Sequence, residues 1–246
     1  MSESSTAAAP AAAPKQPSFW EDLIDIFFQP AGVFRRRQNS SVWPPMLFVA
    51  IGIGVIFFVT FNTLQPIFEA EFARGIAKTT ANNPQITPEA MERMRGVSLS
   101  IGRYAVGIIM LLTMVIVGSV TWLVGKLFGS AQTYHAALVV AAWAHMPRVI
   151  GAVLAGVQGL VLDPAKLTSQ LAISLSPARF LDADTVNPLL YQALGRLDLI
   201  TIWVTILLGI GVYVTGKVGK GQAAAVALLV WVLGALPVLR QAYLSM

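Results

Sequence analysis

The chain of 246 residues contains no cysteine, two histidines and few charged residues. Without cysteine it has no disulfide framework, no thiolate metal site and no cysteine nucleophile. His135 and His145 are ten residues apart with no acidic residue between them, whereas a metal site needs three or more converging ligands. The sequence also lacks the H-E-x-x-H and G-x-S-x-G motifs of metalloproteases and esterases. We therefore expect no catalytic residue, no metal and no cofactor.

Charged residues make up 12% of the sequence and hydrophobic residues 56%, against about 25% and 45–50% in soluble globular proteins. The charges leave long uncharged stretches, which a soluble protein of this length would have to bury in an oversized core. The net charge is +5, but the basic residues flank the apolar runs and do not form one stripe. They therefore predict contacts with lipid headgroups and no nucleic-acid binding. The composition predicts an integral membrane protein whose first partner is the lipid bilayer.

The residues before the long apolar runs divide into two parts. Residues 1–17 are mainly Ala, Pro and Ser, a composition that buries too little apolar surface to become ordered, so we expect a disordered tail. In residues 18–38, Ser18 and Glu21 have the spacing of a capping box that starts a helix ending near Pro30. This helix is too short to cross a bilayer, so its apolar face should lie at the membrane interface. The alternative is an ordinary helix packed against its neighbours. The apolar face carries Trp20, Leu23, Phe27 and Phe28.

Three consecutive arginines follow this helix, in a segment that we expect to be a basic linker. Arg35, Arg36 and Arg37 lie shortly before the first long apolar run, whereas the next basic residue is Arg74. Because cytoplasmic loops of membrane proteins carry an excess of positive charge, this asymmetry predicts a cytoplasmic amino terminus. With five crossings, the carboxyl terminus would lie outside.

Residues 39–246 contain five apolar segments long enough to cross a bilayer as helices. A crossing needs about 20 residues at a rise of about 1.5 Å per residue. The predicted spans cover residues 43–64, 104–128, 132–162, 199–216 and 222–239. The sequence therefore predicts an all-α membrane protein, a five-helix transmembrane bundle with an amino-terminal interfacial amphipathic helix.

The third span is too long for one perpendicular crossing and contains a proline near its middle. We expect the helix to break at Pro147, with an interfacial or re-entrant helix before the break and a crossing after it. Arg148 follows the proline, and a charge at the centre of a bilayer costs about 2.5–3.5 kcal/mol on insertion scales. Our preferred prediction places Arg148 at the interface. If Arg148 is buried instead, its predicted partner is Asp198, because buried charges are normally paired.

Three separate stretches carry a distinctive pattern of proline, aromatic and small residues. The first is LIDIFFQPAGVF followed by VWPP, the second is TYHAALVVAAWAHMPRVIGAVL, and the third is LDLITIWVTILLGIGV. Together they resemble the YIP family, the Ypt/Rab-interacting multi-span membrane proteins, in the form carried by bacterial members. The resemblance covers about residues 19–243.

The resemblance implies a five-helix membrane domain with a cytoplasmic amino terminus and no catalytic residue. The positions that it marks as important are Pro30, Pro147, Asp198, Trp203 and Gly211. Eukaryotic relatives carry an Asp-Leu-Tyr-Gly-Pro motif and act with prenylated GTPases in vesicle traffic. Here Asp22-Leu23 is followed by Ile24-Asp25, so the resemblance does not extend to a GTPase partner.

Two hypotheses for the function follow from these features. The first is a non-enzymatic scaffold in the bacterial cytoplasmic membrane, which organises lipids, partner membrane proteins or copies of itself through its helix faces and its interfacial helix. The second is a small transporter or channel, for which Arg148, Gln158, Asp198 and the broken third span would supply a short polar path. A water-filled cavity reaching Arg148 would favour the second hypothesis over the first.

Overall fold

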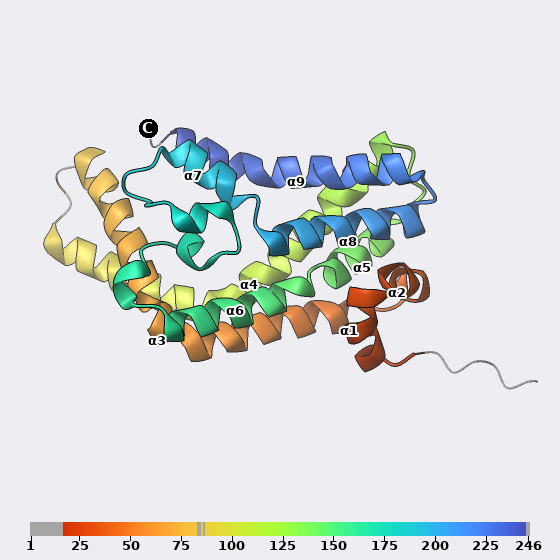
Figure 1. Ribbon diagram of the computed structural model, residues 1–246, viewed down its shortest axis with the longest axis horizontal. Helices are drawn as coiled ribbons and strands as arrows, with labels where there is room; N and C mark the ends of the chain where they lie inside the picture. Colours follow the sequence, from red (N-terminus) through yellow and green to blue (C-terminus); the bar gives the residue numbers. More distant parts are fainter. Residues whose placement is uncertain (1–16, 83–84, 86, 245–246) are drawn as a thin grey trace, which may run out of the picture.

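The computed structural model describes residues 17–82, 85 and 87–244, and this part of the chain contains helices and no strand. The predicted disordered tail, residues 1–17, lies outside the described residues except for Pro17. Within the described part, five helices are long and apolar enough to cross a membrane. They form an elongated bundle (Figure 1). The prediction of an all-α, five-helix membrane bundle is confirmed, and the short helix expected before the first span is present.

The described part of the chain folds into α-helices of very different lengths. In order they are α1 (Phe19–Phe28), α2 (Pro30–Arg37), α3 (Trp43–Asn82), α4 (Pro88–Leu127), α5 (Tyr134–Ala144), α6 (Pro147–Val161), α7 (Pro188–Gly195), α8 (Leu199–Gly216) and α9 (Lys220–Tyr243). Between α6 and α7 lie the short 3-10 helices η1 (Pro164–Lys166), η2 (Gln170–Ile173) and η3 (Pro177–Phe180). The five crossings are α3, α4, the pair α5 and α6, α8, and α9.

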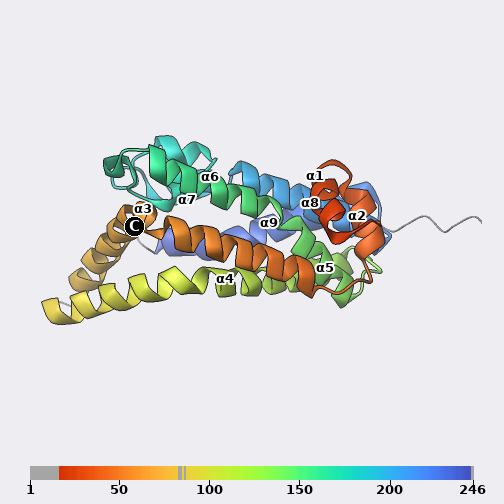
Figure 2. The same cartoon turned by 90° about the horizontal axis from the view of Figure 1, so that it is seen from below.

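The two short helices α1 and α2 lie together at one end of the bundle (Figures 1 and 2). The capping box forms at the start of α1: the Ser18 hydroxyl accepts a hydrogen bond from the Glu21 N–H, and the Glu21 carboxylate accepts one from the Ser18 N–H. α2 begins at Pro30, whose fixed φ and missing N–H suit the first turn of a helix. The segment expected to be a basic linker is helical, and the three arginines form the last turn of α2.

The first two crossings, α3 and α4, extend past the apolar segments predicted for them. Both helices contain 40 residues, and their extra turns project from the bundle at the end opposite α1 and α2 (Figure 2). Pro66 lies inside α3, and an internal proline bends a helix because it removes one backbone hydrogen bond. An ion pair between Arg95 and Glu69 at 2.7 Å links the two extensions. A prediction based only on the length of apolar runs cannot detect polar contacts of this kind, so it underestimates the length of both helices.

The third crossing breaks between α5 and α6, at His145 and Met146. Pro147 is the first residue of α6 and has no backbone N–H to continue the preceding helix. α5 is enclosed by its neighbours along most of its length, whereas α6 exposes apolar side chains such as Ile150 and Val157. The half before the break, predicted to be interfacial or re-entrant, is therefore surrounded by protein, because its small Ala and Val side chains let other helices close around it.

Glycines allow several crossings to approach closely. A Cβ added to Gly211 of α8 would clash with Cγ1 of Val140 in α5 and lie 2.9 Å from its Cγ2. A Cβ added to Gly107 of α4 would lie 3.0 Å from the backbone oxygen of Ala50 in α3. Close packing through small residues is typical of helices in membranes, where contact between helices and not exclusion from water drives association.

The connection between α6 and α8 folds back onto the bundle. Gln158 of α6 donates a hydrogen bond from its Nε2 to the backbone oxygen of Ile173 (2.9 Å) and accepts one from Arg179 (2.8 Å). Arg74 of α3 donates to the backbone oxygen of Thr168 (2.6 Å). These contacts hold the connection against α3 and α6, so the polar Gln158 side chain is engaged within the protein.

Candidate membrane-interface site

A buried carboxylate joins α1 to α2. The Asp22 side chain is 0% exposed and accepts hydrogen bonds from Arg36 and Arg37. Arg36 also pairs with Asp25 at 2.6 Å. Burial acts to lower the pKa of the Arg36 guanidinium, but its hydrogen bonds to Asp22 and Asp25 act in the opposite direction, and the net pKa is raised. A buried charge without a partner is strongly destabilising, so this cluster fixes α2 against α1.

The inner face of α1 packs aromatic rings against the bundle. The Phe19 ring centroid lies 5.5 Å from that of Trp143 in α5, and the Phe27 centroid lies 5.3 Å from that of Trp203 in α8. Between them, Ile26 is fully buried. Aromatic pairs at these distances add to the burial of apolar surface. The hairpin of α1 and α2 is therefore docked on α5 and α8.

The outer face of α1 carries large apolar side chains that remain exposed. Trp20, Ile24 and Phe28 are 68%, 64% and 79% exposed. They recur every four residues, so they line up on one side of the helix. We call these three residues the apolar ridge. A ridge of this kind on a helix too short to span is typical of helices that lie in the membrane interface.

The four residues predicted to contact the interface divide between the two faces of α1. Trp20 and Phe28 belong to the apolar ridge, whereas Leu23 and Phe27 are half-buried and pack against the bundle. Ile24 belongs to the ridge but was missed, although its spacing of four from the two other ridge residues is visible in the sequence. Apolar side chains cover more than one side of α1, so periodicity alone could not show which side faces the bundle.

The three arginines predicted to contact lipid headgroups have different surroundings. Arg35 is exposed, and its side chain forms no hydrogen bond or ion pair with the described residues. Arg36 and Arg37 are half-buried and held by Asp22, and Arg37 also donates to the backbone oxygen of Pro17 (2.7 Å). Among the three, Arg35 is the one whose charge remains available to a headgroup.

The second predicted site brings Arg148 and Asp198 near each other without a direct bond between these two described residues. Arg148 is half-buried, and its Nε is fully buried with no hydrogen-bond partner in the described part of the chain. Asp198 caps α8: its Oδ1 accepts from the Thr201 N–H (2.9 Å) and its Oδ2 accepts from the Leu175 N–H (2.9 Å). Both carboxylate oxygens are therefore occupied, and the charges interact only through space.

Arg196, which sequence reasoning missed, lies close to this pair. Its Nη2 donates to the backbone oxygen of Trp231 in α9 (2.8 Å), and its guanidinium lies 5.5 Å from the centre of the Trp231 ring. Burial lowers the pKa of Arg196. The sequence feature that could have identified Arg196 is its place three positions before the first residue of the fourth predicted span.

We expect Arg148→Gln and Asp198→Asn to affect stability independently. Because both oxygens of Asp198 already accept backbone hydrogen bonds, the coupling energy in a double-mutant cycle should stay below about 1 kcal/mol. Asparagine can still cap a helix, whereas Asp198→Ala removes the cap and should cost about 1 kcal/mol. Thermal unfolding of the detergent-purified single and double variants measures these energies. A coupling above about 1 kcal/mol would show instead that the two charges form a pair.

The remaining positions marked by the family resemblance have structural roles. Pro30 and Pro147 are the first residues of α2 and α6. Trp203 receives the inner face of α1, and Gly211 lets α8 approach α5. Across the residues that the structure describes, no group of three His, Asp or Glu side chains could hold a metal ion.

The family model described as the Yip1 domain matches residues 24–239, from within α1 to within α9. No curated protein and no solved structure matches the chain.

Proposed function

The chain belongs to the Yip1 domain family, and on this premise we propose that it is a non-enzymatic membrane scaffold that organises lipids and partner membrane proteins. We propose the bacterial cytoplasmic membrane as its location, with the amino terminus in the cytoplasm and the carboxyl terminus outside. The proposed protein partner is a second copy of the chain or another membrane protein. A GTPase partner is not proposed, because Asp22-Leu23 is not followed by Tyr-Gly-Pro.

The apolar ridge on α1 is the observation that supports this proposal. Large apolar groups left exposed on a helix that is otherwise docked mark a surface that binds a membrane or another protein. The hairpin is held firmly by the Asp22 cluster and by the aromatic contacts of Phe19 and Phe27. The ridge is therefore presented at a fixed position relative to the five crossings, as a scaffold requires.

We expect the ridge to enter the bilayer interface when the full chain is reconstituted in anionic liposomes. The sequence has no cysteine, so one introduced cysteine gives a single spin-labelling site. A label at Ile24→Cys should be more accessible to oxygen than to a water-soluble nickel complex, because the ridge side of α1 is buried about 5–10 Å into the boundary between headgroups and acyl chains. Power-saturation electron paramagnetic resonance measures both accessibilities.

The matched control is Gln29→Cys. Gln29 is an exposed polar residue at the carboxyl-terminal end of α1, and it lies on a different side of the helix from the ridge. Its label should favour the nickel complex. If the labels at both positions favour the nickel complex to the same extent, α1 does not lie in the interface, and the scaffold loses its supporting observation.

A transporter or channel is the second candidate function, favoured by the unpartnered Nε of Arg148 beside the broken third crossing. A polar residue that lacks a protein partner inside a bundle often lines a path for an ion or solute. The double-mutant cycle on Arg148 and Asp198 bears on this candidate, because an Arg148 charge that couples strongly to Asp198 would be neutralised within the bundle and not available to an ion or solute.

A further inference from the structure

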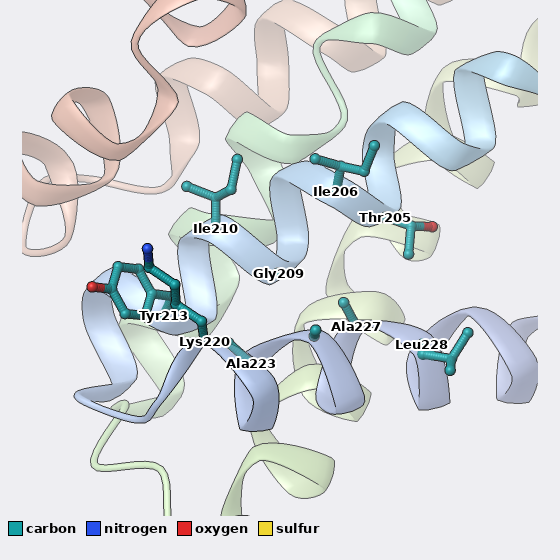
Figure 3. A pocket seen from close by; sticks show the side chains of 10 residues that line it. Thr205, Ile206, Gly209, Ile210, Tyr213, Lys220, Ala223, Ala227 and Leu228 are labelled. Carbon is teal, nitrogen blue, oxygen red and sulfur yellow. The ribbon is translucent and has the colours of Figure 1, made fainter.

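An apolar groove runs between α8 and α9 on the surface of the bundle. It has a volume of about 410 Å³, and its lining includes Gly209, Ala223, Ala227 and Leu228. Tyr213 near the end of α8 and Lys220 at the start of α9 both line this groove (Figure 3). Lys220 is exposed and forms no hydrogen bond or ion pair with the described residues. The groove is therefore apolar along its length and cationic at one end.

A second groove, between α3 and α4, repeats this arrangement. It has a volume of about 330 Å³ and is lined by apolar residues together with Arg103 and Tyr104. The Arg103 guanidinium lies 4.4 Å from the centre of the Phe58 ring. Its Nε is fully buried and has no hydrogen-bond partner among the described residues. The second groove thus also combines an apolar lining with a tyrosine and a cation that has no acidic partner among the described residues.

The two cations lie near opposite ends of the bundle. Gln222, in the first turn of α9, donates to the backbone oxygen of Phe128 (3.1 Å), so Lys220 lies near the carboxyl-terminal end of α4. Arg103 precedes Phe128 by about 25 residues on α4, which corresponds to about 37 Å of helix at 1.5 Å per residue. A bilayer is about 30 Å thick across its hydrocarbon core and about 40–45 Å with its headgroups. The spacing of the cations therefore matches that of the two headgroup layers.

We propose that each groove binds one anionic phospholipid, with an acyl chain along the apolar lining and the phosphate at the cation, one lipid in each leaflet. The apolar lining suits an acyl chain, and a cation at one end can donate charge-assisted hydrogen bonds to a phosphate. The predicted apolar spans of this chain contain no Asp or Glu, so a spanning helix of a second copy would bring no carboxylate to either cation. The inference goes beyond the proposed scaffold, which rests on the apolar ridge and would stand without the grooves.

Native mass spectrometry of the full chain, released from nanodiscs of phosphatidylglycerol and phosphatidylcholine, tests the proposal. The wild type should retain two phosphatidylglycerol molecules. Arg103→Gln and Lys220→Gln should each retain one, and the double variant none. Ala224→Trp, which places a large side chain in the α8–α9 groove at an exposed position while keeping Lys220, should also lose one lipid.

The matched control is Arg240→Gln, which removes an exposed cation of α9 that lines neither groove. It should retain two lipids and the same unfolding temperature as the wild type. Retention of two lipids by the double variant or by Ala224→Trp would overturn the proposal, as would equal retention of phosphatidylcholine. If the wild type instead forms a dimer without lipid, and Ala224→Trp dissociates this dimer, the α8–α9 groove binds a second copy of the chain and the proposal is overturned. None of these results depends on the spin-label measurement on α1, so the two proposals fail separately.

Discussion

Asp22→Asn is expected to loosen the packing of α1 against α2 while leaving the five crossings folded. The substitution removes the negative charge that pairs with Arg36 and Arg37, and the Asp22 side chain is fully buried. Breaking a buried ion pair costs about 3–5 kcal/mol, and we expect the lower value because the arginines are partly exposed. A loss of about 3 kcal/mol lowers the equilibrium constant for packing α1 against α2 roughly a hundredfold. Hydrogen exchange followed by mass spectrometry should show faster exchange of the amides in residues 19–37.

Asp25→Asn is the matched control for this prediction. Asp25 pairs with the same Arg36, but its side chain is 31% exposed. An exposed ion pair contributes about 1 kcal/mol or less, so exchange in α1 should rise by less than about tenfold. If both substitutions accelerated exchange equally, the effect would come from the general loss of acidic charge and not from the burial of Asp22.

Gly211→Ala is expected to destabilise the packing of α8 on α5 by about 2 kcal/mol, within the range known for overpacked cores. The new Cβ would clash with the side chain of Val140, which is 0% exposed. Valine is stiff at χ1 because it is branched at Cβ, so Val140 cannot rotate away without strain. The unfolding temperature of the detergent-purified protein measures the loss.

Val140→Ala supplies a rescue for Gly211→Ala. Alone, it leaves a small cavity and destabilises the protein, but in the double variant the new methyl group at position 211 occupies part of that space. The double variant should be more stable than the sum of the single effects by about 1 kcal/mol or more. Gly221→Ala is the control, because a Cβ at that position meets nothing within 4 Å. It should be neutral or slightly stabilising, and an equal loss at positions 211 and 221 would contradict the steric explanation.

The number of crossings and the start of α1 could be predicted because they depend on local features of the sequence. A run of about 20 apolar residues crosses a bilayer as a helix wherever it occurs. The capping box of Ser18 and Glu21 uses groups only three residues apart. The length of α3 and α4 was underestimated, because their outer turns are held by contacts such as Arg95 with Glu69, which join residues distant in the sequence.

The candidate site could be predicted less well, since its geometry depends on long-range contacts. The sequence placed Arg36 and Arg37 at the membrane surface, and no periodicity could show that both would reach Asp22 on the preceding helix. Similarly, Asp198, which lies next to the fourth span, was predicted to be the partner of a buried Arg148. The loop before α7 brings Leu175 to Asp198 and occupies that carboxylate. Irregular loops of this kind leave no regular pattern in a sequence.

The docking of α1 on α5 and α8 has a consequence for the order in which the protein is assembled during synthesis. The Phe27 ring packs against Trp203, which the ribosome adds to the chain about 175 residues later. At a synthesis rate of about 5–20 residues per second, Trp203 is added roughly 9–35 s after Phe27. During that interval Phe19 gains its partners Phe48 and Trp143, but Phe27 still lacks Trp203 and can bind the membrane surface. α1 is therefore translated before the five crossings but is among the last elements to take its final place, and affinity for lipid would keep it beside the growing bundle until then.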